Sequence, residues 1–214
     1  MGYHRGVHVH GSLVASLLLA LPLAGCDPAR AGDERAVGPP AVSSADERGR
    51  DELRRPQSLV AALAIQPGAR IADVGAGDGY LTWRLAAAAG PGGRIVATDI
   101  DPDALRRLST RLAGLPPAAP VEVHHVLPDD PGLEAASFDL IVLAEVDQYL
   151  ADRTAFFRRL ASALARGGRI AVANRLPYRA RVLAAAQAAG LGARELAPAP
   201  PLPGQFLITL EPRP

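Results

Sequence analysis

A glycine-rich segment with the sequence DVGAGDG, at residues 73–79, stands between a short apolar run at 70–74 and a helix-forming stretch at 80–89. Glycines in such a turn allow tight backbone geometry and close approach of a ligand, and the first turn of the helix offers unpaired N–H groups. Asp99 ends a second apolar run, 22 residues after Gly77. A carboxylate at this place in an α/β fold can accept hydrogen bonds from both hydroxyls of a ribose. The pattern therefore predicts a site for a ligand that contains a ribose.

The spacing of the glycines distinguishes between classes of nucleotide site. A nicotinamide fingerprint has the spacing Gly-x-Gly-x-x-Gly, which requires a third glycine at position 80. Tyr80 occupies that position, and the pattern is Gly-x-Gly-x-Gly. The sequence therefore disfavours a nicotinamide-dependent enzyme.

The elements that must position these residues alternate between strand and helix. Apolar runs predict strands at 70–74, 94–99, 121–126, 138–144, 169–173, 193–196 and 205–211. Helical patterns start at Asp51, cover 80–89, start again at Pro102, place Phe156, Leu160 and Leu164 on one face before Gly167-Gly168, and cover about 178–189. Because strands spaced by helices form mostly parallel sheets, the sequence predicts an α/β domain.

Four segments, in this order and spacing, resemble the class I S-adenosylmethionine (SAM)-dependent methyltransferases: IADVGAGDGY, GRIVATDID, SFDLIVLAEV and ARGGRIAVAN. The resemblance extends over roughly residues 52–211. It implies a Rossmann-like, doubly wound, mostly parallel seven-stranded sheet with a C-terminal antiparallel hairpin. It also implies SAM as the cofactor, held at its methionine end by Asp73, Gly75, Gly77 and Gly79, at its ribose by Asp99, and against its adenine by Ile100.

The adenine end departs from the pattern of this family. Relatives usually carry an Asp after the third strand that binds the adenine amino group, and Leu127 stands at that position. Leu127 cannot make this hydrogen bond. Asp129 or Asp130 could replace the missing carboxylate, and the sequence Pro-Asp-Asp-Pro is equally well explained as a turn.

The segment after the fourth strand is the place where many relatives carry aromatic or His residues. This chain has Glu145-Val-Asp147-Gln148-Tyr149 there. Glu145, Asp147 and Tyr149 are therefore candidates for contact with a methyl acceptor, although polar residues that cap the next helix would show the same pattern. No catalytic residue is assigned, since methyl transfer can proceed chiefly by alignment of donor and acceptor. The sequence does not name the acceptor, which we expect to be a small molecule.

Composition excludes several other classes. The 23 basic and 22 acidic residues leave a net charge of +1, which argues against a nucleic-acid partner because such proteins show a basic surplus. A single Cys excludes an internal disulfide framework and a multi-cysteine zinc site. His124 and His125 are neighbours on a predicted strand and point to opposite faces, so no metal site is predicted. No oligomeric state is predicted.

The N-terminal segment is typical of a targeting sequence. Its apolar run, Leu13 to Leu21, is too short to span a membrane and fits the central region of a secretory signal. The sequence Leu23-Ala24-Gly25-Cys26 resembles the lipobox of bacterial lipoproteins, in which Cys26 would carry the lipid. We therefore expect a lipoprotein-type signal peptide at 1–25, a flexible tether at 26–50 and the methyltransferase domain at 51–214.

Two functional hypotheses follow. The first is a SAM-dependent methyltransferase with an unidentified small-molecule acceptor. The second is a catalytically degenerate binding protein of the same fold, anchored at the membrane, which Leu127 and residues 145–149 favour. Asp27 resembles an inner-membrane retention signal and predicts the periplasmic face of the bacterial inner membrane, or the cytoplasm if the signal is not used. Export is in tension with a cofactor that is made in the cytosol.

Overall fold

A computed structural model of the chain describes residues 44–114 and 116–213. The predicted signal peptide, Cys26 and most of the predicted tether lie outside these residues. No helix of the described segments is long and apolar enough to cross a membrane.

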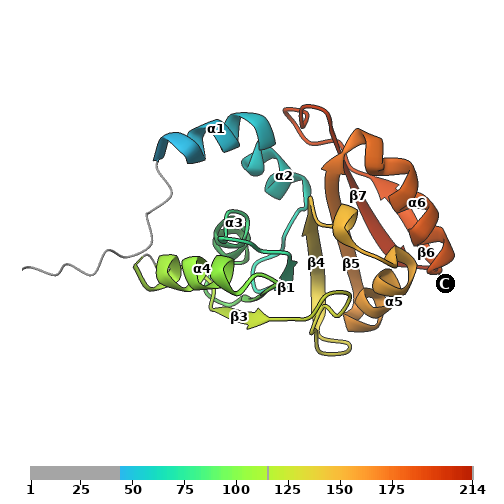
Figure 1. Cartoon of the computed structure of the whole chain (residues 1–214), viewed down its shortest axis with the longest axis horizontal. Helices are drawn as coiled ribbons and strands as arrows, with labels where there is room; N and C mark the ends of the chain where they lie inside the picture. The colour runs from blue at the N-terminus through green and yellow to red at the C-terminus, as the bar shows by residue number, and fades with distance from the viewer. Residues whose placement is uncertain (1–43, 115, 214) are drawn as a thin grey trace, which may run out of the picture. The chain divides into compact units, whose positions relative to one another are not determined.

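Seven strands form one mixed sheet in the order β3-β2-β1-β4-β5-β7-β6 (Figure 1). Strands β1 to β5 pair in parallel, and β7 pairs antiparallel with both β5 and β6. Their bounds are β1 Arg70–Val74, β2 Arg94–Asp99, β3 Val121–His125, β4 Phe138–Ala144, β5 Leu164–Arg175, β6 Leu191–Glu195 and β7 Gln205–Pro212. The predicted seven-stranded, doubly wound sheet with an antiparallel hairpin is therefore confirmed.

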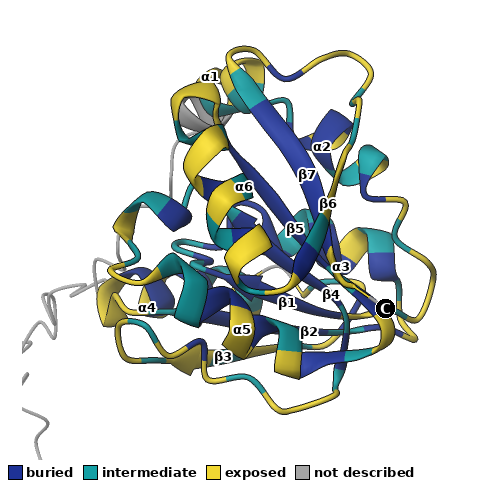
Figure 2. Ribbon diagram, turned by 90° about the vertical axis from the view of Figure 1, so that its right-hand side faces the viewer, coloured by how far each residue is buried: buried dark blue, intermediate teal, exposed yellow. Residues whose placement is uncertain are grey.

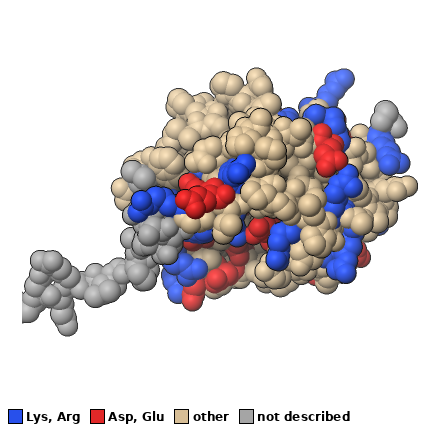
Figure 3. All heavy atoms as spheres, turned by 90° about the horizontal axis from the view of Figure 1, so that it is seen from above, with Lys and Arg blue, Asp and Glu red and all other residues tan. Residues whose placement is uncertain are grey.

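Helices cover both faces of this sheet. They are α1 Ser44–Arg54, α2 Pro56–Ala62, α3 Thr82–Ala89, α4 Pro102–Gly114, α5 Arg153–Ala163 and α6 Arg179–Ala188, with short 3₁₀ turns at Asp147–Tyr149 and Leu176–Tyr178. Helices α5 and α6 share one apolar cluster with the sheet, and α2 and α3 share another. Figure 2 shows the result, with buried central strands between helices whose outer faces are exposed. Basic and acidic side chains are interspersed over the face that Figure 3 presents. The central strands β1, β2 and β4 are mostly buried and apolar, as expected where helices cover both faces, whereas the edge strands β3 and β6 are largely exposed.

Several element boundaries differ by one or two residues from the sequence prediction, and the boundary between α5 and β5 differs in kind. Leu164 was expected on a helix, but α5 ends at Ala163 and Leu164 begins β5, where it pairs with Phe138. The register shifts between Phe138 and Leu140, and this irregularity lets the strand begin before the two glycines that were expected to end the helix. Strand β5 also runs on to Arg175, two residues beyond the predicted end.

The described chain begins with a helix inside the predicted tether. Helix α1 starts at Ser44, so residues 44–50 are helical. Arg50 contacts Asp78, and Asp51 accepts hydrogen bonds from Tyr80, so contacts distant in sequence fix this helix against the domain. Such contacts cannot be read from the local composition on which the tether prediction rests.

Candidate functional site: the cavity at the carboxyl edge of the sheet

The glycine turn lies between β1 and α3, next to the end of β2. The N–H groups of Gly75 and Ala76 both donate to the carbonyl oxygen of Thr98, at 2.8 and 3.0 Å. Gly75 has a φ of 76°, and a Cβ atom there would stand 2.3 Å from a methyl carbon of Val146. At Gly77 a Cβ atom would meet nothing within 4 Å. The turn is therefore packed on the side of Gly75 and open on the side of Gly77, where a ligand can approach.

Asp99 stands at the end of β2, beside this turn. One of its carboxylate oxygens accepts a hydrogen bond from the N–H of Gly77 at 2.7 Å, and the other accepts from the N–H of Asp101 at 2.9 Å. The carboxylate is half-buried, and Ile100, the next residue, is 52% exposed. The structure therefore brings Asp99 and the glycine turn together, as the sequence predicts.

Asp73 lies beneath the turn and is 2% exposed. Its carboxylate accepts a hydrogen bond from the hydroxyl of Thr82 at 2.6 Å. Burial raises the pKa of Asp73 to about 6, the Thr82 hydroxyl works in the opposite direction, and the negative charge of Asp99 adds to the rise. Asp73 is therefore a buried carboxylate at the junction of β1 and the turn, and its charge is costly unless a cationic partner is present.

A cavity of about 730 Å³ opens at the carboxyl edge of the parallel strands. Its walls come from the segments that follow β1, β2, β3, β4 and β5, and they include Gly77, Asp99, Leu127, Tyr149 and Arg175. In open α/β sheets this edge is where ligands bind. The volume is within the range of small-molecule and cofactor sites.

Arginines from α1 and α3 surround Tyr80 at one side of the cavity. Arg50 and Arg84 lie 4.8 and 4.5 Å from the centre of the Tyr80 ring. The Tyr80 hydroxyl donates to Asp51 at 2.6 Å, and Arg84 also pairs with Asp51 at 2.8 Å. Burial, followed by this hydrogen bond, raises the pKa of Tyr80. Tyr80, which replaces the third glycine of a nicotinamide site, therefore anchors α1 above the turn.

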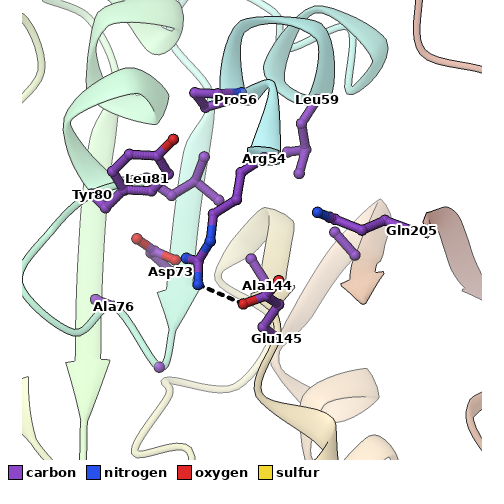
Figure 4. Close-up of a pocket in the computed structure, with 12 residues that line it drawn as sticks. Arg54, Pro56, Leu59, Asp73, Ala76, Tyr80, Leu81, Ala144, Glu145 and Gln205 are labelled. Atoms are coloured by element: carbon purple, nitrogen blue, oxygen red, sulfur yellow. Dashed lines mark hydrogen bonds and ion pairs between the residues drawn. The ribbon is translucent and has the colours of Figure 1, made fainter. Parts of the chain in front are cut away.

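Arg54 connects α1 to the end of β4. Its guanidinium lies 2.6 Å from the carboxylate of Glu145, and Figure 4 shows its side chain running down past Tyr80 to end between Asp73 and Glu145. The sequence analysis missed Arg54. The available signal was the spacing of Arg50 and Arg54, which places two cations one helical turn apart, but nothing in the sequence relates that turn to Glu145.

The three residues predicted after β4 have three different environments. Glu145 lines the cavity, has a φ of 58° and is paired with Arg54. Tyr149 lines the cavity and is 80% exposed. Asp147 is fully buried instead, because its carboxylate accepts a hydrogen bond from Asn174 and lies 3.4 Å from the guanidinium of Arg153. Asp147 therefore supports the loop from behind and does not line the cavity.

The segment after β3 borders the predicted adenine end of the site. Leu127 is 69% exposed and lines the cavity. Asp129 and Asp130 also line it, but each accepts a hydrogen bond from a backbone N–H, of Ala151 and Gly132 respectively. The environment of Asp130 is that of a turn residue. In the described segments, no group of three or more His, Cys, Asp or Glu side chains could hold a metal ion.

Comparisons with known proteins indicate which family and which folds the chain is similar to. Residues 72–170, from β1 to the first half of β5, match a protein family described as "Methyltransferase domain". Over 125 residues the chain is 32% identical to a ubiquinone biosynthesis O-methyltransferase of Xanthomonas campestris pv. campestris (strain B100). This alignment covers 55% of this chain and 48% of that protein. The homologue of Xanthomonas axonopodis pv. citri is 32% identical over 121 residues. The chain thus spans about half the length of the relatives that it matches.

Solved structures share the fold. A SAM-dependent methyltransferase from Aquifex aeolicus superposes with a TM-score of 0.67 at 19% identity, over 76% of this chain and 92% of its own. Magnesium protoporphyrin IX methyltransferase from Synechocystis PCC 6803, solved with bound SAM, gives a TM-score of 0.61 at 16% identity, over 84% and 88%.

The fold and the matched family agree with each other. Residues 72–170 match the methyltransferase domain family, and the described chain has the fold of solved SAM-dependent methyltransferases, one of which was solved with SAM bound.

Proposed function

We propose that this chain transfers a methyl group from SAM to a small-molecule acceptor. The observation that carries the proposal is the position of Asp99, which faces an open glycine turn at the edge of a cavity of about 730 Å³. The name of the Xanthomonas relatives describes methylation of oxygen, which supports a hydroxyl group as the acceptor.

The residues of the cavity fit SAM. Asp99 would accept the ribose hydroxyls, and the exposed side chains of Ile100 and Leu127 offer apolar contact to adenine. The methionine end of SAM carries a carboxylate and an ammonium group. Arg54 and Glu145, a cation and an anion 2.6 Å apart, form a complementary pair for these two groups.

When bound, SAM supplies a methyl group that its sulfonium already makes electrophilic. The residues of the chain therefore need only hold donor and acceptor in line and keep water out, and such alignment is worth roughly 7–11 kcal/mol in favourable cases. The loop after β4 is suited to this task because buried hydrogen bonds hold it. Asn174, which is fully buried, donates to Asp147 and to the side chain of Gln148.

Transfer of radiolabelled methyl groups from SAM to a panel of hydroxylated aromatic small molecules tests the activity. We expect transfer by the full chain and none above background by an Asp99→Ala variant. SAM binding is measured in parallel by calorimetry. Binding without transfer to any member of the panel would favour the catalytically degenerate alternative, and absence of binding by a folded chain would exclude both cofactor and activity.

We further propose that the chain is a lipoprotein anchored through Cys26 at the periplasmic face of the bacterial inner membrane. The support is the apolar run of residues 13–21 followed by Leu23-Ala24-Gly25-Cys26. Several acyl chains together would anchor the protein stably. A Cys26→Ser variant is expected to move from the membrane fraction to the soluble fraction of cells, and unchanged membrane association would contradict the proposal.

A further inference from the structure

The ends of β4 and β5 form one wall of the cavity, which we call the acceptor wall and define as Gln148, Tyr149 and Arg175. The two strands are adjacent, and Ala144 pairs with Ala173 at their carboxyl ends. Asn174 donates to the side chain of Gln148 at 2.5 Å, which ties together the residues just before Arg175 and just before Tyr149. The wall is therefore held in place from behind.

Arg175 differs from the other two arginines that line the cavity. Arg50 lies 3.3 Å from Asp78, and Arg54 lies 2.6 Å from Glu145, so each of these charges is already paired. Arg175 is exposed, and in the part of the chain that the structure describes no carboxylate lies within ion-pair distance of it. Its guanidinium lies 5.6 Å from the centre of the Tyr178 ring.

Among the described residues, no carboxylate that lines the cavity forms an ion pair with Arg175, and four of them are held by backbone N–H groups instead. Asp99 accepts from Gly77 and Asp101, and Asp101 accepts in turn from Asp103. Asp129 and Asp130 likewise accept hydrogen bonds from nearby backbone N–H groups. The cavity thus presents one guanidinium that has no anionic partner among the described residues.

The acceptor wall also carries an exposed aromatic side chain. Tyr149 lines the cavity and is 80% exposed. Leu176, the next residue after Arg175, is 52% exposed but does not line the cavity. A large exposed aromatic side chain in a cavity wall offers a contact surface for a ligand. A guanidinium beside such a surface suits a molecule that combines an apolar or aromatic body with a carboxylate or phosphate.

We propose that the acceptor is an apolar or aromatic small molecule with an anionic group, which Arg175 binds while its body lies against Tyr149. This inference rests on the proposed methyltransferase function, because it assigns the acceptor side of the same cavity. Arg175 thereby determines specificity, and the buried amide of Asn174 positions it.

Two isosteric probes separate the charge from the apolar body: 6-hydroxy-2-naphthoate and its neutral amide, 6-hydroxy-2-naphthamide. Each is titrated into the full chain by fluorescence, with and without saturating S-adenosylhomocysteine. We expect the naphthoate to bind about five- to tenfold more tightly than the amide, a preference that charge-assisted hydrogen bonds at a partly exposed site can supply. Raising the salt concentration should reduce it.

Variants assign the preference to its residue. In Arg175→Gln the two probes should bind equally, and in Arg175→Lys part of the preference should remain. Arg181→Gln is the matched control, because it removes an exposed arginine of α6 that does not line the cavity, and it should preserve the preference. Tyr149→Ala should weaken the binding of both probes by the same factor and leave the ratio of their affinities unchanged.

Equal affinity for the two probes in the unmodified chain, no measurable binding of the naphthoate, or a preference that survives Arg175→Gln would each overturn the inference. Titration with SAM is a separate measurement. If SAM binds and the naphthoate preference is absent, the acceptor assignment fails alone. If SAM does not bind to the folded chain, the proposed function fails, whatever the probes do.

Discussion

Two walls of the same cavity are built from different chemistry. The cofactor wall, residues 75–77 and Asp99, consists of backbone N–H groups and a carboxylate that are already joined by a hydrogen bond of 2.7 Å. The acceptor wall, residues 148–149 and Arg175, consists of the half-buried side chain of Gln148 and the exposed side chains of Tyr149 and Arg175, on a loop and a strand end. The first wall is fixed by close backbone packing, whereas the second is held by buried hydrogen bonds behind it.

This difference predicts different responses to substitution. On the cofactor wall, replacing a glycine by alanine places a Cβ atom against packed atoms or on a backbone with positive φ. Such substitutions should therefore lower the stability of the fold as well as the affinity for the ligand. On the acceptor wall the side chains of Tyr149 and Arg175 are exposed, so changes to these two residues should alter ligand preference and leave the fold intact. A wall of the second kind can vary between proteins that share the first.

The largest effect is expected from Gly75→Ala. The left-handed conformation costs an L-residue roughly 1–2 kcal/mol, and overpacking against Val146 adds roughly 1–3 kcal/mol. Gly77→Ala is the matched control, since its φ of 57° imposes similar strain while a Cβ atom meets nothing within 4 Å. Urea denaturation of both variants measures the difference. If Gly77→Ala proves as unstable as Gly75→Ala, close packing of the turn is not the cause.

The next effect concerns Asp73, whose folded-state pKa is raised to about 6. An acid with a raised pKa binds more protons in the folded state, so its contribution to stability falls as pH rises from its ordinary value of 3.8 through about 6. A shift of about two pKa units corresponds to roughly 3 kcal/mol. Asp73→Asn should therefore be more stable than the unmodified chain by up to roughly this amount at pH 8, with little difference at pH 4. Denaturation curves at the two pH values test this, and a difference that does not change with pH would contradict it.

A smaller effect is expected from Arg54→Ala. Loss of the charge that would face the methionine end should weaken the binding of SAM by about tenfold, which corresponds to about 1.4 kcal/mol of binding free energy. Affinity for 5′-methylthioadenosine, which lacks the carboxylate and the ammonium group, should change by less than about twofold because the contacts to ribose and adenine remain. Calorimetric titration with both ligands measures the two effects. Equal weakening of the affinities for the two ligands would mean that Arg54 supports the structure of the site and does not bind the methionine end of SAM.

The sequence was sufficient to predict that the residues of the cofactor wall lie together, because their pattern is local. Gly75, Gly77 and Asp99 are recognised by their type and their spacing, and parallel pairing of β1 with β2 brings them together. The positions of most strands followed from runs of apolar residues, whereas the seven-stranded arrangement was implied by the resemblance to the methyltransferase family. The resemblance to the methyltransferase family rested on these same segments.

The acceptor wall could not be derived in this way. In the sequence, Asp147 is a polar residue of the kind expected to contact a substrate. The direction in which its side chain points depends on a hydrogen bond with Asn174, which is 27 residues distant. The sequence did not identify Arg175 as a candidate for ligand contact. Its position at the end of β5 depends on pairing with β7, in which Arg175 lies opposite Gln205. The pairing of Arg54 with Glu145 joins residues 91 positions apart. Side-chain direction and long-range pairing are set by packing, which local patterns do not record.

The most direct test of the account is calorimetric titration of the full chain with SAM, beside the variants Asp99→Ala and Asp101→Ala. Asp101 is an exposed carboxylate of the same loop and controls for the change in charge. We expect the unmodified chain and Asp101→Ala to bind with Kd values within about threefold of each other, and Asp99→Ala to bind at least about tenfold more weakly, because it loses charge-assisted hydrogen bonds to the ribose. No binding by a folded chain, or undiminished affinity in Asp99→Ala, would contradict the assignment of this cavity as the cofactor site.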